Sequence, residues 1–206
     1  VDDRPTERAH GDGIEVSTAS PEAFEETIWK HFWADHYLDD RIVPWTSEEA
    51  RPAFDEFFRS HMRKIILLRR EGEGERRRYL SKNNVTVARL AALPSSMRGV
   101  RLIIPFREPV QHAASLLRQH ERFSKIQEKD DFVRRYMASI GHHEFGKELR
   151  PVDFGGWLEG APSPERLEFW LRYWVATYTY VLEHAGPECL LVSYRRLTDE
   201  PEASLR

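Results

Sequence analysis

The residues best suited to chemistry are Arg107 and Ser115. They lie eight positions apart, on either side of the point where the sequence pattern changes from that of a strand to that of a helix. The apolar run 102–106 predicts a buried parallel strand, because it is too short to form a helix of its own. Pro109 suits the first position of a following helix, since its φ is already fixed and it has no amide to leave unpaired. Side chains on a helix lean toward its N-terminus, so the Ser115 hydroxyl is expected to point back toward Arg107. A guanidinium, a hydroxyl and a positive helix end at the carboxyl edge of a strand predict a phosphate-binding site.

Turn signals and hydrophobic spacing predict the elements that position this site. Strands that alternate with helices favour an α/β fold built on a parallel sheet. The expected strands are 78–81, 102–106 and 189–194. The expected helices follow Ser20-Pro21, span 51–68 and 85–93, begin at Pro109, span 130–140, and begin again at Ser163-Pro164.

At these residues the chain resembles the sulfotransferases that use 3′-phosphoadenosine 5′-phosphosulfate (PAPS). In that family a strand ends in Arg, and a Ser eight positions later stands on the next helix, as Arg107 and Ser115 do here. The segment 79–84, Tyr-Leu-Ser-Lys-Asn-Asn, looks like the family's strand-Lys element. Downstream, 190–194 (Leu-Leu-Val-Ser-Tyr) and 197–201 (Leu-Thr-Asp-Glu-Pro) resemble a further strand and helix start of the family.

The resemblance implies a fold, an activity and roles for particular residues. The implied fold is an α/β three-layer parallel sheet flanked by helices, of the P-loop nucleotide-hydrolase type, and we expect one domain over 1–206. The implied activity is transfer of a sulfuryl group from PAPS, without a metal, to a hydroxyl or amine of a small molecule, glycan or lipid. Arg107 and Ser115 would bind the 3′-phosphate, Tyr194 would contact the adenine, and Lys82 would stabilise the transferring group.

Three departures from the family pattern leave two alternatives open. Asn84 stands where many members carry a catalytic His, and Arg195-Arg196 stands where Glu-Asp is usual. The Gly-rich loop that holds the 5′-phosphosulfate is not visible in the sequence, so we expect an incomplete fragment that is inactive alone. The alternatives are a kinase on the same fold, which needs its own Gly-Lys loop and a metal-holding acid, and a non-catalytic interaction domain.

The composition excludes several classes of protein. Lys and Arg (31) nearly balance Asp and Glu (34), so the chain has no large net positive charge that would predict binding to nucleic acid. The single cysteine, Cys189, excludes an internal disulfide. No apolar stretch approaches the roughly 20 residues that a membrane span needs, and we expect a cytoplasmic protein. The sequence identifies neither the acceptor nor the oligomeric state.

Other chemistry-bearing residues have simpler interpretations. Adjacent residues such as His142, His143 and Glu144 rarely converge on one ion, so we expect no metal site there. Residues 141–146 are interpreted as a loop that covers an acceptor, and a His in that loop is a candidate base. Arg89 and Arg118 either add local positive charge to the site or are simply solvated on helix faces, and the sequence supports both interpretations equally. The aromatic residues of 54–58 and 170–178 are expected to belong to the core.

Overall fold

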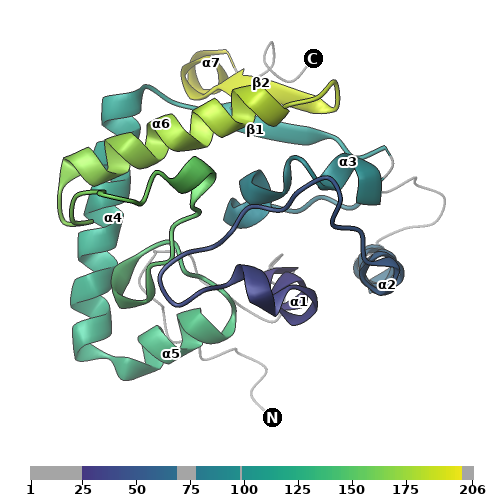
Figure 1. Cartoon of the computed structure of the whole chain (residues 1–206), viewed down its shortest axis with the longest axis horizontal. Coiled ribbons are helices and arrows are strands. Elements are labelled where there is room, and N and C mark those ends of the chain that lie inside the picture. The colour runs from purple at the N-terminus through teal and green to yellow at the C-terminus, as the bar shows by residue number, and fades with distance from the viewer. Residues whose placement is uncertain (1–24, 69–77, 98, 201–206) are drawn as a thin grey trace.

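The structure is a computed structural model that describes residues 25–68, 78–97 and 99–200, and helices make up most of this part of the chain (Figure 1). Its first half contains α1 (Glu25–Phe32), η1 (Ala34–His36), α2 (Pro52–Leu68), η2 (Asn84–Arg89), α3 (Leu93–Ser96) and β1 (Leu102–Phe106). Its second half contains α4 (Pro109–Lys129), α5 (Asp131–Ser139), η3 (Gly146–Glu148), η4 (Phe154–Gly156), α6 (Leu167–His184), β2 (Cys189–Ser193) and α7 (Tyr194–Asp199).

The sheet of the described residues contains two strands, β1 and β2, which pair in parallel (Figure 1). Leu102 lies opposite Cys189 and Phe106 opposite Ser193, so the carboxyl ends of both strands lie at one edge. A three-layer α/β fold needs a wider parallel sheet with helices over both faces. The predicted three-layer sheet of the P-loop type is therefore wrong, because the described chain is mainly helical with a two-stranded sheet.

The predicted strand 78–81 is not formed in the structure. Residues 78–83 form no regular structure and lead directly into η2. The Asn83 side chain accepts a hydrogen bond from the Val85 amide at 2.9 Å and so caps the start of η2. The predicted helix 85–93 is correspondingly replaced by η2 and the short α3.

Other elements agree more closely with their predictions. Helix α2 falls within 51–68, α5 within 130–140, and β1 coincides with the apolar run 102–106. Pro109 is the first residue of α4, as its backbone geometry favours. Helix α6 begins later than predicted, at Leu167, and β2 ends one residue earlier, because Tyr194 begins α7. The predicted helix start at Ser20-Pro21 lies outside the described residues.

Apolar side chains remain exposed on both strands of the sheet. Ile103 of β1 is 57% exposed and Leu190 of β2 is 56% exposed. Each strand has only one partner among the described residues, so both are edge strands. Pro105, which lacks an amide for pairing, is tolerated in such a strand. Its carbonyl accepts a hydrogen bond from the Tyr178 hydroxyl of α6 at 2.9 Å, which ties the sheet to that helix.

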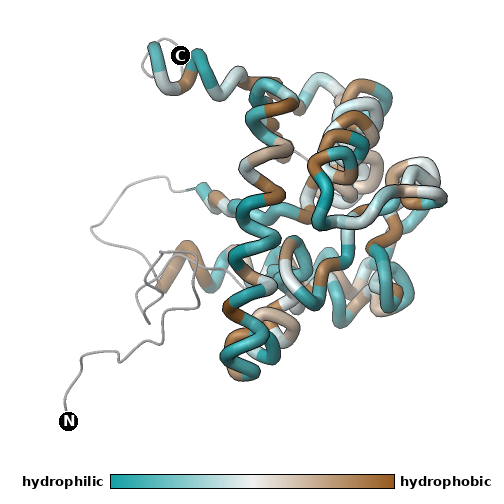
Figure 2. Tube along the Cα trace, turned by 90° about the vertical axis from the view of Figure 1, so that its left-hand side faces the viewer, coloured by the Kyte–Doolittle hydropathy of each residue, from teal (hydrophilic) through white to brown (hydrophobic). Residues whose placement is uncertain are grey.

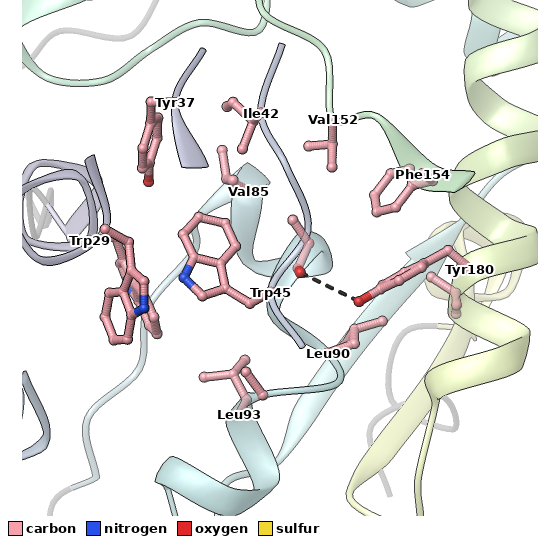
Figure 3. Close-up of a cluster of buried hydrophobic side chains, with 14 of the residues drawn as sticks. Trp29, Tyr37, Ile42, Trp45, Val85, Leu90, Leu93, Val152, Phe154 and Tyr180 are labelled. Atoms are coloured by element: carbon pink, nitrogen blue, oxygen red, sulfur yellow. Dashed lines mark hydrogen bonds between the residues drawn. The ribbon is translucent and has the colours of Figure 1, made fainter. Parts of the chain in front are cut away.

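The main core joins α1, α2 and η2 to α6, and it is rich in aromatic residues (Figure 3). Trp29, Trp45 and Phe54 are each at most 3% exposed. The Tyr180 hydroxyl of α6 donates a hydrogen bond to the backbone carbonyl of Ala88 at 3.5 Å, and Figure 3 draws this bond as a dashed line from Tyr180. Burying a large apolar side chain contributes roughly 1.5–3 kcal/mol, so this cluster accounts for much of the folding free energy.

The long helix α4 supports the other half of the molecule through its contacts with α5 and α6. Figure 2, which views the molecule from the side of α4, shows hydrophobic residues at intervals along a mainly hydrophilic helix. Ala113 of α4 packs with Phe169 and Trp170 of α6, and Phe123 of α4 packs with Val133 of α5. Within residues 25–68, 78–97 and 99–200, no helix combines the length and apolar character that a membrane span requires.

Candidate functional site

Arg107 and Tyr194 meet at the carboxyl edge of the sheet. Arg107 directly follows β1 and Tyr194 directly follows β2, and the residues before them, Phe106 and Ser193, lie opposite each other. The central carbon of the Arg107 guanidinium lies 5.2 Å from the centre of the Tyr194 ring. This is a cation–π contact. Tyr194 is 47% exposed, so its ring is accessible to a ligand.

The start of α4 is already occupied by a carboxylate of the chain itself. The Glu108 side chain accepts hydrogen bonds from the amides of Val110 at 3.1 Å and Gln111 at 2.7 Å. These amides are among the unpaired groups that make a helix N-terminus attractive to anions. The prediction that the positive helix end itself helps to bind phosphate is therefore wrong for these two amides. The Arg107 side chain remains as a cationic group at this edge.

Ser115 lies farther along α4 and is partly buried. Six residues separate it from Pro109, which corresponds to about 9 Å along the helix axis. No hydrogen bond joins Ser115 to Arg107 in the described part of the chain. The structure thus places both residues on the β1–α4 unit but does not bring their polar groups into contact.

His112, one turn into α4, is an additional polar group beside Arg107. Burial, together with the Arg107 charge, lowers the pKa of His112. Within the part of the chain that is described, His112 Nδ1 and Arg107 Nε are buried and lack hydrogen-bond partners. Buried nitrogen atoms without partners are uncommon in folded proteins. The sequence interpretation overlooked His112, although its position five residues after Arg107 places it on the same helix start.

Lys82 is exposed and lies in the irregular segment before η2 rather than at the end of a strand. Its two following neighbours anchor this segment. Asn83 Nδ2 donates to Glu26 Oε2 at 2.8 Å, and Asn84 Nδ2 donates to Glu144 Oε1 at 2.9 Å. The segment is therefore fixed to α1 on one side and to the loop after α5 on the other.

The Asn83 anchor belongs to a buried polar cluster centred on Arg89. The Arg89 side chain is fully buried, and its Nη2 donates to both oxygens of Glu26, at 2.8 and 2.9 Å, and to Tyr37 Oη at 2.9 Å. Its guanidinium also contacts two indole rings, with its central carbon 4.2 Å from the ring centre of Trp29 and 4.5 Å from that of Trp45. Burial raises the pKa of Tyr37, so its hydroxyl stays protonated and also bonds Glu26.

The prediction of a solvated Arg89 is wrong for a reason visible in its neighbours. Val85, Ala88 and Leu93 surround it in the chain, and all three are buried. Because Val85 and Ala88 of this short 3-10 helix face the core, the Arg89 side chain is buried together with them. An arginine in this setting is retained only if a carboxylate neutralises it, and Glu26 supplies that charge from α1.

The loop that follows α5 lies beside the Lys82 segment. Its His143 is 2% exposed, with Nδ1 3.2 Å from the carbonyl oxygen of Glu148. Burial, aided by the charges of Arg150 and Lys30, lowers the pKa of His143 to about 4, so its ring is neutral at neutral pH. In the described residues no group of His, Cys, Asp and Glu side chains is arranged to hold a metal ion.

A groove of about 580 Å³ runs along α6 and η4. Phe154, Trp157 and Val175 contribute apolar walls, and Glu168 and Arg172 contribute charge. None of the predicted site residues lines this groove. The groove is therefore separate from the edge of the sheet where Arg107 lies and from the segment that carries Lys82.

Comparison of the chain with protein-family models, curated proteins and solved structures found no match. Functional inference therefore depends on the residues and contacts described above. The contact that bears most directly on a ligand is the one between Arg107 and Tyr194.

Proposed function

We propose that the chain is part of a PAPS-dependent sulfotransferase whose nucleotide site is centred on Arg107 and Tyr194. The observation that carries this proposal is the cation–π contact between the Arg107 guanidinium and the Tyr194 ring at the carboxyl edge of two parallel strands. Ligands of open parallel sheets bind outside the carboxyl ends of the strands. A cation and an aromatic ring side by side match the phosphate and the base of a nucleotide.

Arg107 suits the 3′-phosphate of such a donor. A guanidinium offers parallel N–H donors that bind phosphate oxygens in pairs. Within the described chain the Arg107 guanidinium donates one hydrogen bond, a long one from Nη2 to Gln111 Oε1 at 3.5 Å. Its donors are therefore poorly satisfied without a ligand. In this proposal Ser115 adds a hydroxyl donor from α4, and Tyr194 packs against the adenine.

Lys82 would act on the other half of the donor. In sulfuryl transfer the acceptor attacks sulfur in line, and charge develops on the oxygen that bridges sulfur and the departing phosphate. A compact ammonium on a flexible stem can follow that charge. Lys82 is exposed, and Asn83 and Asn84 fix its backbone, which leaves its side chain available for this role.

Replacement of Arg107 tests the proposed nucleotide site. In the intact protein, Arg107→Lys should weaken binding of adenosine 3′,5′-bisphosphate by roughly 1–3 kcal/mol, because a point charge cannot replace a two-pronged donor. Isothermal titration calorimetry measures this change. Arg118→Lys is the matched control, since Arg118 is exposed on the same helix and should leave the affinity unchanged.

The same titration separates the proposal from its rivals. Equal affinity in Arg107→Lys and the parent would contradict the role of Arg107. Preference for ATP with magnesium would indicate a kinase, and failure to bind either nucleotide would indicate an interaction domain.

A further inference from the structure

Glu144, in the loop between α5 and η3, is held beside the Lys82 segment. Its Oε1 accepts a hydrogen bond from Asn84 Nδ2 at 2.9 Å. Asn84 stands two residues after Lys82, so their Cα atoms lie at most about 7 Å apart. A lysine side chain is long and flexible, so its ammonium can reach the neighbourhood of the Glu144 carboxylate. A cation and a carboxylate can thus act on one bound group.

A second carboxylate, Glu26, also bonds this segment, but it is unsuited to proton transfer. Its two oxygens accept hydrogen bonds from Arg89, Asn83 and Tyr37. Only 5% of the residue is exposed, so an acceptor molecule cannot approach it. Glu26 therefore anchors the segment and takes no part in its chemistry.

Glu144 differs from Glu26 in both respects. It is only partly buried, and no donor among the described residues reaches its second oxygen, Oε2. The neighbouring His143 is 2% exposed and has a pKa lowered to about 4 by burial, so its ring is directed into the protein and is a poor base. Glu144 thus combines a hydrogen bond to the segment that carries Lys82 with an oxygen that no donor of the described residues reaches.

We propose that Glu144 is the base that removes the proton from the sulfuryl acceptor, an inference that rests on the proposed sulfotransferase function. The acceptor O–H or N–H bond breaks, and its proton passes to Glu144 Oε2. The freed electron pair forms the new bond to sulfur. The bond from sulfur to the bridging phosphate oxygen breaks, and its electron pair leaves with adenosine 3′,5′-bisphosphate. Lys82 stabilises the charge on that oxygen.

Glu144→Gln in the intact protein isolates this role. Glutamine keeps the oxygen that accepts from Asn84 but cannot take up the proton. With PAPS as donor and n-octanol or N-acetylglucosamine as acceptor, kcat should fall by about 100-fold to 10,000-fold. The dissociation constant of adenosine 3′,5′-bisphosphate should not change. Glu159→Gln, an exposed position in another loop, is the matched control and should keep full activity.

A more acidic acceptor sharpens the test. With 4-nitrophenol, which ionises without help, Glu144→Gln should keep most of the parent's kcat, because no base is needed. Equal loss with the alcohol and with 4-nitrophenol, or a lowered melting temperature, would show that Glu144 is structural and would overturn the inference.

Two further outcomes separate this inference from the function on which it rests. A variant that transfers to the alcohol as fast as the parent would overturn the role of Glu144 and leave the sulfotransferase assignment intact. A parent protein that neither binds adenosine 3′,5′-bisphosphate nor transfers from PAPS to any of these acceptors would overturn both.

Discussion

At the scale of single residues, Arg89 shows how a buried charge is kept in an aromatic core. The guanidinium donates to Glu26 and Tyr37 and contacts the rings of Trp29 and Trp45. Even so, its Nε and Nη1 are buried without partners in the described chain. The cluster is therefore incompletely satisfied, and its stability depends on keeping both charges together.

Removal of one charge from this cluster should be strongly destabilising. Arg89→Met preserves much of the side-chain volume but leaves the Glu26 carboxylate buried without its cation. We expect the free energy of unfolding to fall by about 3–5 kcal/mol, measured by urea denaturation. Arg195→Met is the control, since the Arg195–Asp199 ion pair is exposed and should contribute less than about 1 kcal/mol. A small loss for Arg89→Met would mean that Glu26 is neutral or hydrated in the folded protein.

At the scale of elements, the loop after α5 is fitted closely against α1. Gly141 follows that helix with a φ of +79°, a conformation that costs other residues energy. A Cβ atom at this position would lie 2.7 Å from Glu26 Cγ. The loop that carries Glu144 can therefore approach the Glu26 cluster only because residue 141 has no side chain.

Replacing Gly141 and Gly99 separately by alanine distinguishes the cost of backbone strain from the cost of the close contact with Glu26. Gly99 has nearly the same φ, +78°, but a Cβ atom there would meet no atom of another segment within 4 Å, so Gly99→Ala reports strain alone. We expect Gly99→Ala to cost about 1–2 kcal/mol in urea denaturation and Gly141→Ala to cost more. Equal losses would show that Glu26 moves aside without penalty.

At the scale of the whole molecule, the fold should become less stable in mild acid. Burial lowers the pKa of His143 from 6.5 to about 4 and also lowers that of His120. The unfolded chain therefore binds more protons than the folded one as the pH falls below 6.5. The contribution of His143 is fully present above pH 6.5 and is lost as the pH falls toward about 4. This loss is at most about 3 kcal/mol for His143.

Urea denaturation across this pH range measures the effect. His143→Gln should reduce the dependence of the unfolding free energy on pH between 6.5 and about 4, because glutamine does not titrate. His31→Gln is the control, since the His31 ring is exposed on α1. An unchanged pH dependence in His143→Gln would mean that the imidazole becomes protonated without leaving its site.

The local sequence was sufficient to predict an element where one short segment specifies that element. Pro109 at the start of α4 and the apolar run of β1 are examples. Steric limits on proline and the hydrophobicity of a short run act within a few residues. Such effects can be predicted without knowledge of the rest of the chain.

Tertiary contacts decided the number of paired strands, the burial of Arg89 and the surroundings of Lys82. Segment 78–83 and the adjoining Asn84 form hydrogen bonds to Glu26 and Glu144, which lie 57 and 60 residues away in the chain from Asn83 and Asn84, instead of joining the sheet. A local pattern gives the preference of a segment for strand or helix but not the distant partner that competes for its polar groups. For this protein, sequence pattern therefore determined β1 and the start of α4, whereas long-range hydrogen bonds placed Glu144 beside the segment that carries Lys82.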